Sequence, residues 1–301
     1  MSRTSPRAKT YEHTERITVA GRIRKFLVVT GAPVQGSTEG SETTPAAHAH
    51  PSAVLLFLHG SHQNGHSLRR FSGASFDDLA SDGRVAVVYP HAVRWLWNHG
   101  NDDERHADDV AFMAALADHF RALYGPVPVI AAGYSNGGQM VIRMIHEIPE
   151  KFDGAAIVSA TLPRPGGLEF VDKHMPMPVV LIHGTHDLVV PYRGESGFWG
   201  LGSKNRGPSA PQTAEYFAAR NKIFGGPVIS DIPSRPESGR TKVILSSHDQ
   251  DGCPPVALYT VAGGGHVVPN PATRAVTLLG RTTRDINTAD IVAEFFPALR
   301  P

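Results

Sequence analysis

Hydrophobic positions along the chain fall into short uninterrupted runs that are separated by longer polar stretches. The β-prone runs cover Val54 to Leu58, Val85 to Tyr89, Val127 to Ala132, Ala155 to Val158, Val179 to His183 and Ala257 to Val261. A strand inside a parallel sheet is buried on both faces, so it appears as a continuous apolar run rather than an alternating one. These runs therefore predict the strands of a mostly parallel sheet.

Between these runs, apolar residues recur with the spacing of a helix. This helical spacing occurs from Ala107 to Leu123 and again from Gln139 to Glu147. Thr288 is placed to cap a last helix that continues through Phe296. Strands that alternate with helices predict an α/β fold in which helices cover both faces of a mostly parallel sheet.

The length of 301 residues suits one large α/β domain, and no internal repeat divides it. Residues 1–52 are expected to form a polar tail, a β-hairpin around Ala20-Gly21-Arg22, and a flexible loop rich in Gly, Ser, Thr and Pro. Residues 53–301 are expected to form the catalytic α/β domain itself.

Charge, cysteine content and the lengths of the apolar runs limit the expected partners, disulfides and location of the protein. The chain has 29 basic and 28 acidic residues and a net charge of +1, so nucleic acid and anionic membrane surfaces are not expected partners. Its single cysteine, Cys253, leaves no intrachain disulfide. No segment approaches the ~20 apolar residues of a membrane span, and no secretory leader is visible, so we expect a cytoplasmic protein. Secretion through a trimmed leader or another route stays open, as does the oligomeric state.

Ser135 lies between two glycines, Gly133 and Gly137, at the end of a predicted strand. A G-x-S-x-G sequence between a strand and a helix is the nucleophile elbow, which exposes the serine hydroxyl at a strained corner above the sheet. Glycines are needed because the backbone passes too close to itself for a Cβ. The spacing differs from G-x-G-x-x-G, which disfavours a dinucleotide site. The run therefore predicts a nucleophilic serine.

Two later loops supply partners for this serine. A serine hydroxyl needs a base within hydrogen-bond reach, and the base needs a group that orients it. Asp187 follows the strand at Val179 to His183, and His266 follows three glycines after the strand at Ala257 to Val261. The order Ser, Asp, His is that of an elbow-type triad. We predict that Ser135 is the nucleophile, His266 the base and Asp187 the acid.

An oxyanion site is expected beside the serine. Backbone N–H groups of Asn136 and of the loop after the first buried strand are the predicted donors, with Ser61 favoured in that loop and His62 as the second choice. The same loop carries His59, His62 and His66, which could converge on zinc. Acidic ligands are missing nearby and the loop has no helical period, so no metal site is predicted.

Several aromatic and polar residues remain to be placed. Candidates for the substrate pocket are His62, Tyr134, Trp97, Tyr192 and Trp199. Trp95 and Trp97 either line the pocket or plug the core. Asp108 and Asp109 open a predicted helix, where carboxylates cap N–H groups, and His183 is interpreted as a packed support of the acid loop.

With these residues identified, the chain resembles the polyhydroxybutyrate depolymerase and feruloyl esterase group of α/β-hydrolases, which includes the LpqC-like esterases. The matching segments are Leu58-His59-Gly60, Trp97-Asn98, Asp108 to Phe112, Gly133 to Gly138, His183 to Asp187 with Pro191-Tyr192, and Gly263 to His266. They lie between about Val54 and Phe296. The resemblance implies the α/β-hydrolase fold and a serine esterase without a cofactor, carrying its triad on Ser135, Asp187 and His266.

The substrate is less sharply indicated. Many members of that group are secreted and disulfide-bonded, which this chain is not expected to be, and no separate polymer-binding module is visible. Small or oligomeric soluble esters are therefore favoured, either hydroxyalkanoate oligomers or small and aromatic esters. The glycine-rich stretch at 192–211 is expected to be irregular and to shape the pocket. The alternatives are a peptidase or acyltransferase on the same triad, or a binding protein that keeps the fold without chemistry.

Overall fold

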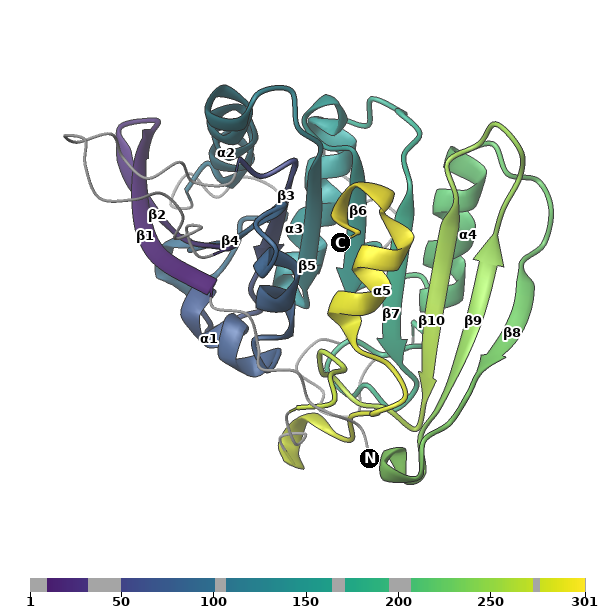
Figure 1. Ribbon diagram of the computed structural model, residues 1–301. Helices are drawn as coiled ribbons and strands as arrows, with labels where there is room; N and C mark the ends of the chain where they lie inside the picture. The colour runs from purple at the N-terminus through teal and green to yellow at the C-terminus, as the bar shows by residue number, and fades with distance from the viewer. Residues whose placement is uncertain are drawn as a thin grey trace.

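A ten-stranded sheet runs through the molecule in the computed structural model (Figure 1). The structure describes residues 10–31, 50–100, 107–163, 171–194, 207–272 and 277–300. Its strands are β1 (Thr10–Val19), β2 (Arg22–Gly31), β3 (Ala53–Leu58), β4 (Val85–Pro90), β5 (Val129–Tyr134), β6 (Gly154–Val158), β7 (Val179–Gly184), β8 (Val228–Ile232), β9 (Lys242–His248) and β10 (Val256–Ala262).

The strands lie in the order β1-β2-β4-β3-β5-β6-β7-β10-β9-β8. Strands from β4 to β10 in this order pair in parallel, whereas the hairpin β1–β2 and the outer strands β9 and β8 pair antiparallel. All the parallel strands therefore end at one edge of the sheet, and the loops that follow them meet there. The predicted α/β class with a mostly parallel sheet is confirmed.

Helices cover the sheet on both faces. The α-helices are α1 (Gly65–Phe71), α2 (Asp109–Tyr124), α3 (Asn136–Glu147), α4 (Ala210–Arg220) and α5 (Thr288–Phe295). Shorter 3₁₀ segments are η1 (Ser75–Ala80), η2 (Val93–Trp95), η3 (Pro149–Lys151), η4 (Pro236–Ser238), η5 (Thr277–Leu279) and η6 (Pro297–Leu299). Helices α2, α3 and α4 contribute to one apolar core, whereas α1, η1 and α5 contribute to the core on the other face.

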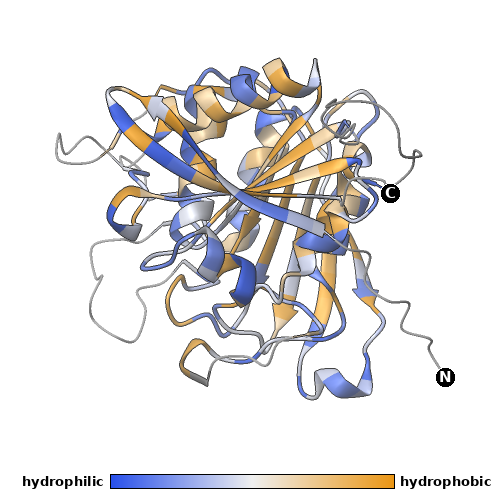
Figure 2. Ribbon diagram, turned by 60° about the vertical axis from the view of Figure 1, so that its left-hand side comes forward, coloured by the Kyte–Doolittle hydropathy of each residue, from blue (hydrophilic) through white to orange (hydrophobic). Residues whose placement is uncertain are grey.

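Strand β3 shows why its sequence is apolar throughout. Val54, Leu56 and Leu58 belong to one core, while Leu55 and Phe57 belong to the other. Because successive side chains of a strand point to opposite faces, both sets must be apolar when both faces are covered. The central strands are accordingly coloured mostly hydrophobic in Figure 2.

The N-terminal hairpin forms one edge of the same sheet. Strand β2 pairs with β4, and its residues Phe26 to Val29 are buried on both faces. Arg24 of β2 forms a buried ion pair with Asp109 of α2 at 2.5 Å. The domain boundary at residues 52 and 53 stays a prediction, and residues 32–49 of the expected flexible loop lie outside the described residues.

The structure confirms one predicted helix cap and contradicts the other. Asp108 caps α2, since its carboxylate accepts a hydrogen bond from the Ala111 N–H at 2.8 Å, as the sequence predicts. The predicted cap of the last helix is wrong: Asn287 is the N-cap of α5, and its side chain accepts from the Ala289 N–H. Thr288 is instead buried, and its hydroxyl donates to the Pro269 carbonyl at 2.7 Å.

The sequence pattern predicted no element between residues 212 and 255, where the structure has most of α4 together with β8 and β9. Strand β8 lies at the free edge of the sheet and is largely exposed, so its sequence lacks the apolar run of a central strand. Within the described residues, no helix is long and apolar enough to cross a membrane.

Candidate active site

Ser135 sits at the corner between β5 and α3. Its backbone has φ 53° and ψ −119°, a region that non-glycine residues rarely occupy, and its N–H donates to the Val158 carbonyl at 2.9 Å. A Cβ on Gly133 would collide with the Gly137 backbone, and a Cβ on Gly137 would collide with the Leu58 carbonyl. The two glycines are therefore required by the close packing of the elbow against β3.

The loops after β7 and β10 bring an aspartate and a histidine to this serine. His266 Nε2 lies 2.9 Å from Ser135 Oγ, and His266 Nδ1 lies 2.7 Å from Asp187 Oδ2. All three residues are buried, with exposed fractions of 8% for Ser135 and 4% for each of the other two. The three predicted triad residues thus form one hydrogen-bonded chain, although 131 positions separate Ser135 from His266.

The Asp187 carboxylate is held at both oxygens. Oδ1 accepts from the N–H groups of Val189 and Val190 at 2.9 and 2.8 Å, while Oδ2 faces His266. Burial alone would raise the pKa of Asp187, but His183 and His266 act against it and hold the pKa at about 2. An ionised carboxylate in this place can orient the imidazole and stabilise its protonated form.

Tyr134 supports the histidine from behind. Its hydroxyl donates to the His266 carbonyl at 2.8 Å, and its ring lies 5.1 Å from the imidazole. Burial and the nearby charge of Asp187 raise the pKa of the Tyr134 phenol, so the phenol stays neutral and remains a donor. Tyr134 is only 3% exposed, so it braces the His266 loop from within the core.

The two predicted oxyanion donors are the N–H of Asn136, the residue after Ser135, and the N–H of Ser61, in the loop after β3. Within the described residues, neither the Asn136 N–H nor the Ser61 N–H donates to a protein acceptor. His62, the second choice in that loop, is unsuitable because its N–H donates to the Trp95 carbonyl at 3.0 Å. The geometry therefore leaves Asn136 and Ser61 as the candidate pair, and their role in binding an oxyanion stays a prediction.

The loop after β4 braces this region. The indole N–H of Trp97 donates to the His59 carbonyl at 2.8 Å, and the Trp97 backbone N–H donates to Asn136 Oδ1 at 2.8 Å. Trp97 is 3% exposed and its ring packs against the His59 imidazole at 4.8 Å. Trp97 therefore joins both sides of the candidate oxyanion site and plugs the core beneath it.

The other predicted pocket residues take different positions. Tyr192 is half-buried, and its hydroxyl bonds the Thr260 hydroxyl at 2.9 Å. His62 is exposed on a left-handed backbone. Trp199 lies outside the described residues, as does most of the 192–211 stretch.

Three exposed apolar side chains adjoin the loops of the site: Trp95, which the sequence left open between pocket and core, and Leu188 and Val189, which were not predicted as pocket residues. Trp95 is 59% exposed, and its carbonyl is tied to the loop that carries Ser61. Leu188 and Val189 are exposed directly after Asp187. Their signal in the sequence is that large apolar residues adjoin the loops that carry Ser61 and Asp187 and lie outside every strand and helix that the sequence pattern predicts.

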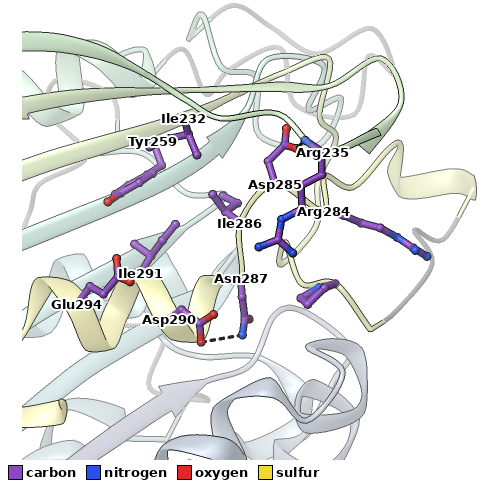
Figure 3. A pocket seen from close by; sticks show the side chains of 11 residues that line it. Ile232, Arg235, Tyr259, Arg284, Asp285, Ile286, Asn287, Asp290, Ile291 and Glu294 are labelled. Atoms are coloured by element: carbon purple, nitrogen blue, oxygen red, sulfur yellow. Dashed lines mark hydrogen bonds between the residues drawn. The ribbon is translucent and has the colours of Figure 1, made fainter. Parts of the chain in front are cut away.

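A separate cavity of about 230 Å³ lies between α5 and strands β8 and β10, and it contains no triad residue (Figure 3). Its lining mixes arginines, carboxylates and isoleucines, and the Asn287 side-chain amide donates to Asp290 Oδ1 at 3.0 Å at the start of α5. In the part of the chain that the structure describes, no group of three or more His, Cys, Asp or Glu side chains is placed to hold a metal ion. The trio His59, His62 and His66 forms no such group.

Comparison with known proteins gives matches to esterases. A family model described as phospholipase/carboxylesterase matches residues 116–198, which include Ser135 and Asp187. NocK of Nocardia uniformis subsp. tsuyamanensis, which is named as an esterase, is 29% identical over 297 residues, covering 93% of this chain and 80% of NocK. The bifunctional acetylxylan esterase/xylanase XynS20E of Neocallimastix patriciarum is 27% identical over 158 residues, which are 51% of this chain and 22% of that protein.

The structural comparison addresses the fold. An acetyl xylan esterase from Aspergillus awamori superimposes with a TM-score of 0.58 over 95% of this chain and 99% of that one, at 11% identity. At that identity the likeness concerns the fold alone. Together with the strand order and the helices on both faces, it shows that this chain has the α/β-hydrolase fold, and the sequence matches relate it to carboxylesterase-type hydrolases.

Proposed function

We propose that this protein is a serine hydrolase of carboxylic esters that works through an acyl-enzyme on Ser135. The observation that carries the proposal is the hydrogen-bonded chain from Ser135 through His266 to the ionised Asp187. A serine hydroxyl next to an oriented imidazole base can attack a carbonyl carbon at neutral pH. The similarity to esterases favours an ester carbonyl.

In the proposed reaction, Ser135 Oγ bonds to the ester carbonyl carbon while its proton passes to His266 Nε2. The N–H groups of Asn136 and Ser61 stabilise the oxyanion. The carbon–oxygen bond to the alcohol then breaks, and the alcohol leaves with the proton from His266. Water attacks the acyl-enzyme with His266 as the base, which releases the acid and restores Ser135.

The proposed substrates are small or oligomeric soluble esters. Hydroxyalkanoate oligomers and aromatic esters follow from the sequence resemblance, and the names of the relatives add acetyl esters. Exposed apolar side chains favour an acyl or alcohol group with apolar or aromatic surface: Leu188 and Val189 directly follow Asp187, and the Trp95 carbonyl accepts the N–H of His62 in the Ser61 loop. A peptidase or acyltransferase using the same triad is the second candidate, since all three groups would serve it equally.

The test is hydrolysis of a panel by the purified protein and by Ser135→Ala. The panel holds p-nitrophenyl acetate, butyrate and octanoate, methyl ferulate, a soluble hydroxybutyrate oligomer and a matched peptide. Loss of the nucleophile is expected to lower kcat on the order of 10⁶-fold while the circular dichroism spectrum is unchanged.

An active Ser135→Ala variant would refute the proposal. Cleavage of the peptide at the rate of the matched ester would support the peptidase instead. No cleavage, together with no reaction of Ser135 with an organophosphonate, would support a binding protein that only keeps the fold.

A further inference from the structure

We propose that His183 is a positioning residue for the acid of the triad, holding the loop that carries Asp187 and moderating how strongly this carboxylate acts on His266. The inference rests on the proposed function. His183 is the next-to-last residue of β7 and is 1% exposed. Its place at a strand end beneath the acid loop makes it a neighbour of Asp187 that never reaches the substrate.

Val190 links His183 to Asp187 through two hydrogen bonds. His183 Nε2 lies 2.8 Å from the Val190 carbonyl, so Nε2 carries the proton and donates it. The N–H of the same residue, Val190, donates to Asp187 Oδ1 at 2.8 Å. His183 therefore holds the carbonyl of the residue whose N–H holds one oxygen of the Asp187 carboxylate.

The Nε2 atom of His183 also lies close to Oδ2, the second oxygen of the Asp187 carboxylate. It lies 3.4 Å from Asp187 Oδ2, the oxygen that His266 Nδ1 approaches at 2.7 Å. The proton of Nε2 is directed to Val190, so 3.4 Å is not a strong hydrogen bond, but the partial positive charge of this N–H still lies close to the carboxylate. One carboxylate oxygen is thus shared by two imidazoles, and its negative charge is partly compensated before His266 is protonated.

The imidazole of His183 cannot leave this position freely. The ring of Tyr192 packs edge-on against it at 5.9 Å, and the Tyr192 hydroxyl bonds Thr260, which is the partner of His183 on β10. The imidazoles of His183 and His266 act most strongly on Asp187, and the neutral phenol of Tyr134 also lies within reach of its charge. Removal of the His183 N–H would therefore leave His266 as the principal donor to Oδ2.

This arrangement has a directional consequence for pH dependence. Without the His183 N–H, more of the Asp187 charge acts on His266, which stabilises the protonated imidazole. The acid limb of the pH–rate profile should then move to higher pH. A residue that only fills space would change stability and leave this limb in place.

The experiment compares His183→Leu, which removes the donor, with His183→Gln, whose side-chain amide can present an N–H near the position of Nε2. The matched control is His248→Leu, because His248 is also a buried histidine of this sheet, at 4% exposure, but pairs with Val256 at the start of β10, away from the triad.

For His183→Leu we expect kcat to fall on the order of 10-fold, far less than the roughly 10⁴-fold loss seen when a triad acid is replaced. The acid limb should move to higher pH. His183→Gln should restore most of both values, and His248→Leu should change neither.

A readout independent of turnover is the low-field proton resonance of the hydrogen bond between His266 and Asp187, identified by its loss in His266→Gln. It should shift in His183→Leu and return in His183→Gln. An unmoved acid limb and an unmoved resonance in folded His183→Leu would overturn the inference. A wild-type protein that neither cleaves esters nor reacts with phosphonate would overturn the proposed function instead, while the resonance would still test His183.

Discussion

At the scale of single residues, the site depends on a buried carboxylate that stays ionised. Asp187 is 4% exposed, yet each of its oxygens has donors, two backbone N–H groups on Oδ1 and His266 on Oδ2. A buried charge is tolerated only when it is partnered in this way. The donors to Oδ1 are two and three residues from Asp187, whereas His266 lies 79 positions away and reaches Oδ2 only through the fold.

The hydrogen bonds to the Asp187 carboxylate predict how the stability of the fold depends on pH. The pKa of Asp187 falls from its ordinary value of 3.8 to about 2 in the fold. Its contribution is therefore fully present above about pH 4 and is lost as the pH falls toward 2, amounting to about 2 kcal/mol. The difference in free energy of unfolding between wild type and Asp187→Asn should shrink by that amount between pH 6 and pH 2, measured by urea unfolding. An equal difference at both pH values would contradict this assignment.

Trp95 is the residue for which exposure suggests a contact with substrate. Stacking of an aromatic group on an exposed indole contributes about 0.5–1.5 kcal/mol, so Trp95→Ala should lower kcat/KM for methyl ferulate roughly 2- to 12-fold. The value for p-nitrophenyl acetate serves as the internal reference and should change less. Phe224→Ala is the matched control, since Phe224 is 85% exposed in the turn between α4 and β8. Equal losses for both esters would exclude the stacking role.

At the scale of elements, the elbow, β3 and the loop after β4 form one assembly. The glycine run predicts the corner at Ser135, and the structure shows that Gly137 lies against the Leu58 carbonyl of β3. The brace from Trp97 to His59 and Asn136 joins three segments that are distant in sequence. The apolar pattern does not decide the role of Trp97, because a buried and a pocket-lining tryptophan look alike in sequence.

The elbow glycine provides the element-scale prediction. A Cβ on Gly137 overlaps backbone atoms that cannot move without shifting β3, so Gly137→Ala should cost at least about 3 kcal/mol of unfolding free energy and should lower kcat. Gly226→Ala is the control, because no atom lies within 4 Å of its added Cβ and its change should stay within about 0.5 kcal/mol. Denaturant unfolding measures both. Equal stabilities would show that the elbow can relax.

At the scale of the whole molecule, a buried ion pair joins strand β2 of the N-terminal hairpin to helix α2. Arg24 and Asp109 are almost fully buried, the guanidinium lies over the Phe112 ring at 4.0 Å, and Asp109 also accepts the Asn98 N–H. Burial raises the pKa of Asp109 and lowers that of Arg24, in each case against the attraction of the partner. Desolvation therefore offsets much of what the pair contributes.

This balance between desolvation and attraction predicts that the effects of substitutions at Arg24 and Asp109 on the free energy of unfolding are not additive. Asp109→Ala leaves Arg24 buried without its counter-charge and should cost about 3–5 kcal/mol of unfolding free energy. The double variant Arg24→Met with Asp109→Ala removes both charges and should be distinctly more stable than Asp109→Ala alone. A double-mutant cycle by urea unfolding measures the coupling. Additive losses would show that the pair is not coupled across β2 and α2.

The sequence by itself determined the elements whose signal is local. Continuous apolar runs predicted the central strands, because burial on both faces leaves no polar position, and the glycine pattern predicted the corner at Ser135. The order of Ser135, Asp187 and His266 predicted which loops meet, since parallel strands end at one edge of the sheet. Strand β8 is exposed and therefore has no continuous apolar run, so the sequence pattern did not predict it.

Only the tertiary structure decided which groups are satisfied by which partners. The cap at Asn287 in place of Thr288 depends on a carbonyl of Pro269, the loss of His62 as a donor depends on Trp95, and the support of Asp187 by His183 depends on how the loop at Val190 folds back. Hydrogen bonds are short and directional, so they are set by the packing of segments far apart along the chain, whereas hydrophobic periodicity is already present within each segment.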